Sequence, residues 1–200
     1  GAIQPEVVLW RERPQETPEE TEMLFLRLCE QYHNLEVWCD DRVQSWLPPV
    51  RGSASSFTYG DAEQLAHRVH GELQLGDRPG QELLRVLEEV CGVKVFHWSF
   101  QPTGTAASTK SPTFGYAILL NQDNVRWRRN FDLAHELFHL LTWDMFRSAD
   151  DESSCEAAPT EEKFATCFAS NLLMPASAVR LALQRPMHEG KVTFESLFDV

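Results

Sequence analysis

Residues 130–143 read Asn130-Phe131-Asp132-Leu133-Ala134-His135-Glu136-Leu137-Phe138-His139-Leu140-Leu141-Thr142-Trp143 and contain neither glycine nor proline. This uninterrupted run is expected to form one helix. Four residues advance an α-helix by about 400°, so His135 and His139 project from one face within ~40° of each other. Two imidazoles at this spacing can share one small cation, and zinc accepts both. The H-E-x-x-H pattern therefore predicts a zinc site on this helix.

Glu136 is offset from His135 by about 100° along the same rim of the helix. This offset is too large for the best third ligand, but it suits a general base that takes a proton from a water molecule at the metal. The alternative is that the histidines are exposed and only solvate one face of the helix. The apolar residues on either side argue against it, because two histidines and a glutamate would be costly to bury without partners.

A catalytic zinc needs a third protein ligand, and the helix expected over residues 161–174 offers one before Pro175 ends it. The stripe of this helix that is expected to be buried consists of Phe164, Ala165, Phe168, Ala169, Leu172 and Leu173. Glu162 lies at the edge of that stripe and is the predicted ligand. Glu161, one position further round, is the second choice. The remaining alternative is a solvated carboxylate that the helix dipole favours in a first turn.

The composition limits the classes of partner. A formal net charge of -12 repels phosphate backbones, so nucleic acid is disfavoured as a whole-surface partner and remains only as an activator bound at a local basic patch. The five cysteines are odd in number and form no C-x-x-C pair, which predicts reduced thiols and no thiolate-only zinc site. No apolar run approaches the ~20 residues that span a bilayer. We therefore expect a cytoplasmic protein without a membrane partner.

The rest of the chain predicts an α+β fold, mostly helical, with a small three-stranded sheet beside the H-E-x-x-H helix. Strands are expected at residues 93–98, 116–121 and 125–129, and a loop is expected at 101–113. Residues 46–57 have the composition of a linker. We therefore expect residues 1–57 to form an N-terminal arm and helix, and residues 58–200 to form the domain that carries the zinc site.

Two motifs together resemble the ImmA/IrrE family of zinc metallopeptidases. The first is Phe131-Asp132-Leu133-Ala134-His135-Glu136-Leu137-Phe138-His139-Leu140, and the second runs from Glu162-Lys163-Phe164-Ala165 through Phe168-Ala169 to Leu172-Leu173-Met174-Pro175. The resemblance extends loosely over residues 61–182. It implies a zincin-like domain of the gluzincin type, in which the glutamate of the second motif, here Glu162, is the third zinc ligand.

The resemblance also implies a function and one more site residue. Family members usually have asparagine four residues after the ligand glutamate, where this chain has Thr166, which we expect to hydrogen-bond a zinc histidine. Such proteins are known for cleaving helix-turn-helix repressors. The implied function is a zinc endopeptidase that cleaves such a repressor in a stress, mobile-element or phage-defence switch, including the response to DNA damage. The alternative is a regulatory module that binds a repressor or DNA without cleaving.

A peptidase of this kind must be kept inactive until it is needed. Zinc binds thiolate strongly at its open fourth position. Cys155 lies in the polar loop between His139 and Glu162, so we consider it an inhibitory fourth ligand. Cys91 and Cys167 are more distant candidates, and the plain alternative is that Cys155 is an ordinary reduced thiol.

Other residues invite less specific interpretations. Residues 116–121 are a candidate edge strand that pairs with the backbone of an extended substrate. The stretch Arg126-Trp127-Arg128-Arg129 could bind single-stranded nucleic acid, although a charged strand end is the favoured interpretation. The remaining histidines lack ligand spacing and are not proposed as metal ligands; they are His33, His67, His70, His97 and His188.

Overall fold

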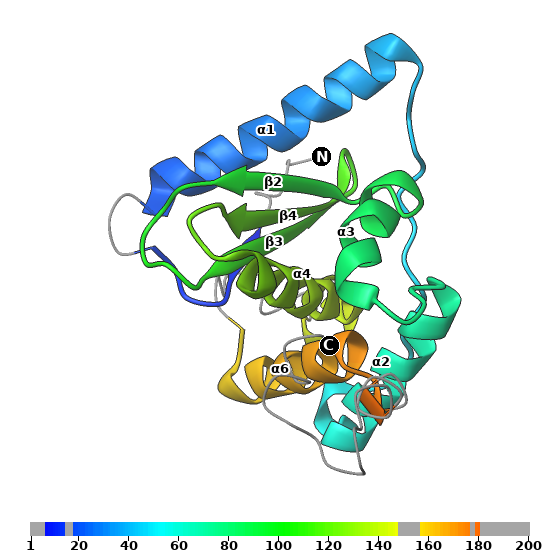
Figure 1. The fold of residues 1–200 in the computed structure, drawn as a ribbon. Coiled ribbons are helices and arrows are strands. Elements are labelled where there is room, and N and C mark those ends of the chain that lie inside the picture. The colour runs from blue at the N-terminus through cyan, green and yellow to red at the C-terminus, as the bar shows by residue number, and fades with distance from the viewer. Residues whose placement is uncertain (1–6, 15–17, 148–156, 177–178, 181–200) are drawn as a thin grey trace.

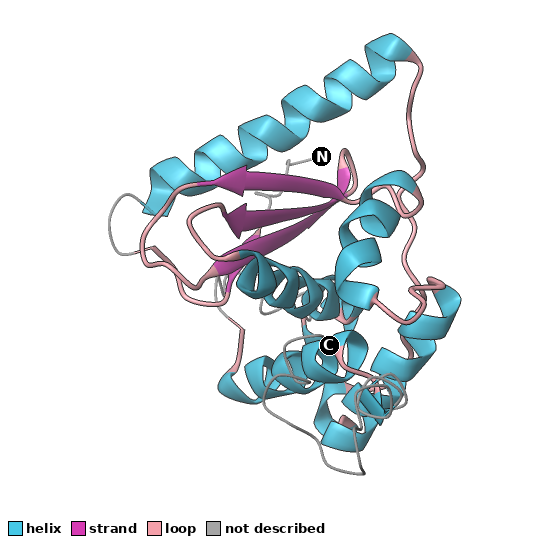
Figure 2. Ribbon diagram, viewed as in Figure 1, coloured by secondary structure: helices cyan, strands magenta, loops and turns pink. Residues whose placement is uncertain are grey.

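The computed structural model of the chain describes residues 7–14, 18–147, 157–176 and 179–180. Its elements follow the order β1 (Val8–Trp10), α1 (Pro18–Cys39), η1 (Ala54–Ser56), α2 (Tyr59–Glu72), α3 (Pro79–Glu89), β2 (Lys94–Trp98), β3 (Ala106–Ser111), β4 (Gly115–Asn121), α4 (Arg126–Leu141), α5 (Trp143–Phe146) and α6 (Pro159–Leu173). Helices surround one small sheet (Figure 2). The predicted α+β class is confirmed.

The sheet separates two hydrophobic clusters. On one face, Phe25 and Cys29 of α1 pack with sheet residues such as Ala107 and Leu119. On the other face, α4 lies against the sheet, with α3 beside it and α6 and α2 beyond it (Figure 1). The helix that carries the H-E-x-x-H motif therefore lies in the interior of the larger cluster, and each of its residues from Asp132 to Leu141 is buried.

Within the described residues, the sheet has four strands in the order β1-β3-β4-β2, not the three that were expected. β3 pairs antiparallel with both β1 and β4, whereas β2 pairs parallel with β4. The predicted strands at 93–98 and 116–121 correspond to β2 and β4. β4 has a neighbour on each side, so both of its edges are hydrogen-bonded. The interpretation of residues 116–121 as a substrate-binding edge strand is therefore wrong.

The third expected strand, at residues 125–129, is instead the beginning of α4. Val125 has extended backbone angles and the helix starts at the next residue. Within the helix, Nε of Arg128 donates to Asp132 at 2.9 Å, an (i, i+4) contact that only helical geometry provides. Charged residues alternate with Trp127 in this stretch, which resembles the pattern of a strand, but Trp127 lies on the exposed side of a helix.

Two strands lie where irregular chain was expected. β3, Ala106–Ser111, falls within the predicted loop 101–113 because its small and polar residues carry no apolar alternation. Its buried hydroxyls are satisfied instead by hydrogen bonds; for example, Oγ1 of Thr109 donates to the carbonyl of Val7 at 2.7 Å. β1 lies within the expected N-terminal arm and pairs with β3 over only three residues.

A helix was expected within residues 1–57; α1 lies there and buries Phe25 and Cys29. The boundary predicted between residues 57 and 58 stays a prediction, although Trp10 and Phe25 from its N-terminal side join the second hydrophobic cluster. The segment after this boundary begins with a capping box, in which Thr58 and Asp61 hold the start of α2. Among the described residues, no helix is both long enough and apolar enough to cross a membrane.

Candidate metal centre

Three donor side chains from two helices meet between α4 and α6. His135 and His139 project from one face of α4, and Glu162 comes from the first turn of α6. Oε2 of Glu162 lies 3.0 Å from Nε2 of His135, and its Oε1 lies 3.2 Å from Nε2 of His139. One ligand atom from each residue lies within 4.8 Å of the others. Within the part of the chain that the structure describes, this is the one group of at least three such side chains suited to a metal ion.

The burial of these side chains tests whether a cation fits. His135 and His139 have exposed fractions of 0% and 1%. Nε2 of His139 and Oε1 of Glu162 are buried atoms without a hydrogen-bond partner, despite their proximity. Leaving such groups unpaired costs free energy. A cation between them would remove that cost, and two imidazoles with one carboxylate are a donor set that zinc accepts.

Glu136 lies beside this group and is fully buried. Its Oε2 accepts a hydrogen bond from Oγ of Ser108 at 2.7 Å, and its Oε1 has no partner. Burial raises the pKa of Glu136 to about 7, and the hydrogen bond from Ser108 opposes part of that rise. A carboxylate with a pKa near neutrality and one unpartnered oxygen is suited to accept and return a proton.

Glu161 occupies a place that the sequence interpretation did not give it. We expected it to lie further from the core than Glu162, but it is the more buried of the two, with an exposed fraction of 3%. Its Oε1 lies 2.8 Å from Nδ1 of His139 and accepts a hydrogen bond from Nη1 of Arg147 at 2.9 Å. Glu161 therefore contacts the side of the His139 ring that faces away from Glu162.

The electrostatics of the group follow from these contacts. Burial lowers the pKa of His135 to about 4. Burial alone would also lower the pKa of His139, but its close contacts with the carboxylates of Glu161 and Glu162 outweigh this effect and raise it to about 9. For Glu162, the close contacts with both histidines overcome the effect of burial and lower the pKa to about 2. In the metal-free protein, the pair formed by His139 and Glu162 is therefore charged at neutral pH.

A comparison with protein families decides the classification. The family described as the IrrE N-terminal-like domain, peptidase family M78, matches residues 88–200, more than half of the chain. The chain belongs to this peptidase family. The resemblance to the ImmA/IrrE family is thereby confirmed, and the matched region includes α4, α6 and the three strands β2 to β4. None of the curated proteins matches the chain.

Two further residues were predicted for the site, Thr166 and Cys155. Thr166 lies one turn after Glu162, but it is exposed, and the contact with a histidine ring that we expected of it is made by Glu161. The buried stripe of α6 runs through Glu161, Ala165 and Phe168, so position 166 turns toward solvent. Cys155 lies outside the described residues, and its role as a fourth ligand stays a prediction.

Ser108, Glu161 and Arg11 contact the motif residues, although the sequence gave Ser108 and Arg11 no place in the site and gave Glu161 only as the second choice of metal ligand. A signal for Glu161 was present, because Glu161, Ala165, Phe168 and Leu172 share the helical spacing of a buried stripe. Ser108 had no comparable signal, since it lies in a strand of small and polar residues that was taken for a loop. Arg11 lies beside the short strand β1 and far from the motif in sequence.

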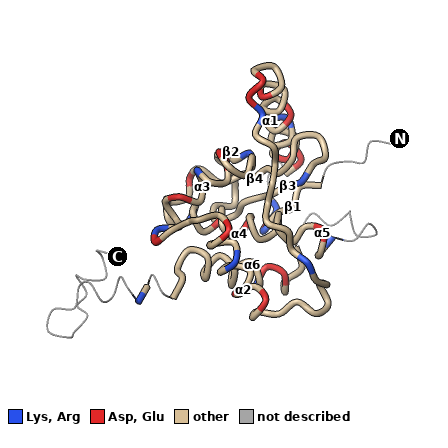
Figure 3. Tube along the Cα trace, turned by 90° about the vertical axis from the view of Figure 1, so that its right-hand side faces the viewer, with Lys and Arg blue, Asp and Glu red and all other residues tan. Residues whose placement is uncertain are grey.

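The arginines of the 126–129 stretch are largely engaged within the fold. Arg128 contacts Asp132, and Nη1 of Arg129 donates to the carbonyls of Gln122 and Asn124 at 2.9 and 3.0 Å. Basic and acidic residues are interspersed along the described chain (Figure 3). These contacts agree with the interpretation of the stretch as a charged end of a structural element, here a helix rather than a strand.

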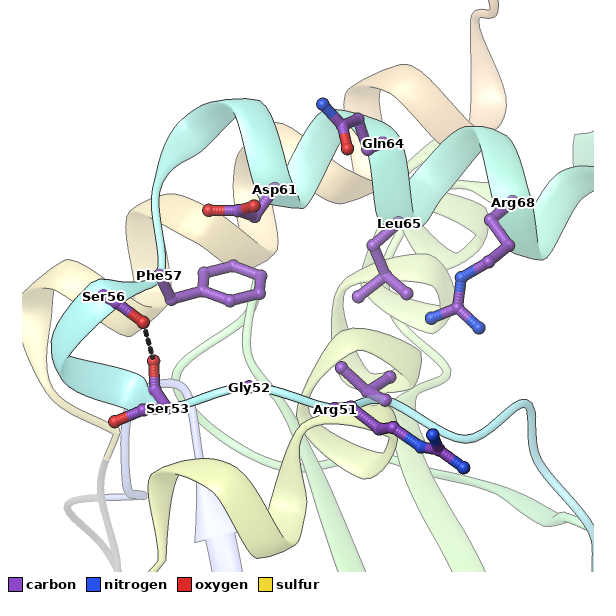
Figure 4. Close-up of a pocket in the computed structure, with 10 residues that line it drawn as sticks. Arg51, Gly52, Ser53, Ser56, Phe57, Asp61, Gln64, Leu65 and Arg68 are labelled. Carbon is purple, nitrogen blue, oxygen red and sulfur yellow. Dashed lines mark hydrogen bonds between the residues drawn. The ribbon is translucent and has the colours of Figure 1, made fainter.

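A hollow beside α2 lies apart from the candidate ligands. It is lined by Val50, Arg51, Gly52, Ser53, Ser56, Phe57, Asp61, Gln64, Leu65 and Arg68 (Figure 4). None of the candidate metal ligands is among them. Phe57 also packs edge-on against Phe138 of α4, with ring centroids 5.9 Å apart. The irregular segment before α2 therefore supports the motif helix from the side that faces away from the sheet.

Proposed function

We propose that this chain is a zinc-dependent endopeptidase in which His135, His139 and Glu162 hold the metal and Glu136 is the general base. The observation that carries the proposal is the convergence of two buried histidines and the partly buried Glu162, with the buried, proton-accepting carboxylate of Glu136 beside them. A non-catalytic metal site would have no need of Glu136 in this place. Membership of a peptidase family supports the same assignment.

Each residue of the centre has a separate task in this proposal. Zinc, when bound, supplies a Lewis acid that polarises the peptide carbonyl and makes water a better nucleophile at neutral pH. Glu136 accepts the proton of the attacking water through its free Oε1 and later gives it to the leaving amine. Ser108 holds the other oxygen of Glu136 in place. Glu161 fixes the tautomer and the orientation of the His139 ring.

We extend the proposal to a substrate class. The resemblance to the ImmA/IrrE family favours a helix-turn-helix repressor as the substrate, in a cytoplasmic switch that responds to stress, a mobile element or a phage. This extension rests on the family resemblance alone. The competing function is a module that binds such a repressor and leaves it intact.

The test compares the wild type with Glu136→Gln and Glu162→Ala, each as the full chain. The wild type is expected to retain zinc and to cleave peptides from a mixed synthetic library, as read by mass spectrometry. Glu136→Gln should retain zinc and lose cleavage, because an amide of nearly the same shape cannot accept the proton of water. Glu162→Ala should lose most of its zinc.

Two outcomes would contradict this assignment. Wild-type cleavage by Glu136→Gln would remove Glu136 as the base, and wild-type zinc content in Glu162→Ala would remove Glu162 as a ligand.

A candidate repressor, encoded beside this chain, then separates the two functions. A repressor that binds the zinc-loaded wild type and stays intact would favour the non-cleaving module.

A further inference from the structure

Arg11, just after β1, approaches the metal centre from outside the region that matches the family. Its backbone N–H donates to the carbonyl of Ala106 at 3.3 Å, which continues the pairing of β1 with β3 by one residue. Leu9 lies opposite Ser108 in that register. Side chains two residues apart on a strand share a face. Arg11 therefore projects from the sheet on the side where Ser108 meets Glu136.

The guanidinium of Arg11 lies between one carboxylate of α4 and one of α6. Its Nη1 is 3.3 Å from Oδ1 of Asp132, and its Nε is 3.9 Å from Oε2 of Glu162. Asp132 precedes His135 by three residues on α4, and Glu162 is the donor from α6. One cation thus links the helix that carries both histidines with the helix that carries the glutamate.

Asp132 is a firm anchor for this arrangement. It is buried, with an exposed fraction of 1%. Besides Arg11, it accepts hydrogen bonds from Nε of Arg128 at 2.9 Å and from Nδ2 of Asn124 at 3.0 Å. Three side chains thus hold Asp132 in place. Its position therefore fixes where the guanidinium of Arg11 lies relative to Glu162.

We propose that Arg11 is a positioning residue that holds the carboxylate of Glu162 in the orientation required to bind the metal. The proposal rests on the ligand set given above. Glu162 is the most exposed of the three donors, with an exposed side-chain fraction of 21%, and it lies in the first turn of α6. Oε2 of Glu162 also contacts Nε2 of His135 at 3.0 Å, so removal of Arg11 leaves the Glu162 side chain less restrained against rotation toward solvent. The bond that Arg11 makes to Asp132 opposes this rotation.

Removal of the Arg11 charge has two opposing effects on metal affinity. A cation beside the site repels a metal ion, but the side chain of Arg11 is 25% exposed, so water screens part of that repulsion. Loss of a residue that orients a metal ligand typically lowers metal affinity by about 10- to 100-fold. We therefore expect removal of the Arg11 charge to weaken metal binding.

The experiment uses the full chain with Arg11→Met, which keeps an apolar stem of similar length and removes the charge. Arg128→Met is the matched control, because Arg128 contacts the same oxygen of Asp132 without an ion pair to Glu162. Arg11→Lys tests rescue by a conservative change. Zinc affinity is measured by competition with a chelator, and Co²⁺ is added to the metal-free protein as a probe whose visible absorption reports its ligands.

Arg11→Met is expected to lower zinc affinity by about tenfold or more and to change the Co²⁺ spectrum in the direction that Glu162→Gln changes it. Arg128→Met should keep the wild-type spectrum, and Arg11→Lys should recover part of the affinity. If Arg11→Met keeps the wild-type Co²⁺ spectrum and zinc affinity, the proposal is overturned. It is also overturned if Arg128→Met loses as much zinc affinity as Arg11→Met. If Glu162→Gln itself leaves the spectrum unchanged, the proposed ligand set fails as well. A changed Glu162→Gln spectrum with no effect of Arg11→Met removes only the role of Arg11.

Discussion

Nδ1 of His139 lies 2.8 Å from Oε1 of Glu161, while Nε2 of the same ring faces Glu162 at 3.2 Å. Neighbouring residues of one helix thus contact opposite sides of a single imidazole. Glu162 is placed to share a metal with His139, and Glu161 is placed to orient the ring. Arg147 holds Glu161 in turn, with Nη1 and Nη2 both 2.9 Å from its Oε1.

The first prediction concerns this pair. Glu161→Gln keeps the shape of the side chain and removes the charge that polarises the His139 ring, so zinc affinity should fall by about tenfold. Thr166→Ala, in the next turn of α6 and exposed, is the control and should leave the affinity unchanged. Chelator competition measures both variants. An affinity loss in Thr166→Ala as large as that in Glu161→Gln would return Thr166 to the site and contradict the structural assignment.

Ser108 should influence the pH dependence of catalysis. Burial raises the pKa of Glu136, and the hydrogen bond from Ser108 opposes that rise. Ser108→Ala removes the opposing contact, so the pKa of Glu136 should rise further and the acidic limb of the kcat/KM profile should move to higher pH by about one unit. Thr109→Val removes a hydroxyl from the opposite face of the same strand and serves as the control. A profile that stays in place in Ser108→Ala would show that Ser108 does not act on the base.

Metal uptake should release a proton. The pKa of His139 in the metal-free protein is raised to about 9, so its imidazole is protonated at neutral pH, whereas zinc binds the neutral ring. Zinc affinity should therefore increase by about tenfold for each pH unit up to about pH 9 and level off above it. Chelator competition at several pH values, corrected for protonation of the chelator, measures this slope. Affinity that does not change between pH 7 and pH 8.5 would contradict the charged state of His139.

The next prediction concerns Cys155 as an inhibitory fourth zinc ligand, here called the latch. If its thiolate occupies the fourth position of the zinc, Cys155→Ser should raise basal peptide cleavage, because a neutral hydroxyl is a much poorer zinc ligand. Cys167→Ser is the control, since Cys167 lies on α6 and its Sγ is 3.8 Å from the carbonyl of Tyr59, away from the donors. Equal basal cleavage by the wild type and Cys155→Ser would dispose of the latch.

Local spacing was sufficient for the centre of the site. His135, Glu136 and His139 lie within five consecutive residues, so helical periodicity alone determines how their side chains are arranged relative to one another. Helical periodicity also predicted that a glutamate in the first turn of α6 faces the histidines. It did not resolve the tasks of Glu161 and Glu162, because these depend on how α6 is rotated and translated against α4.

The sequence by itself determined the motif helix, the α+β class and the family resemblance. Only the tertiary structure placed Ser108 against Glu136, Glu161 behind His139 and Arg11 beside Glu162. β3 was not predicted because its residues are small and polar and show no apolar alternation. Pairing with β1 and β4 holds it in the sheet. The position of Arg11 at the site was not predicted because it lies 121 residues from Asp132 in the chain. Contacts of this kind depend on strand register and helix packing, which arise from the sum of many distant interactions and leave no periodic pattern in a single stretch of sequence.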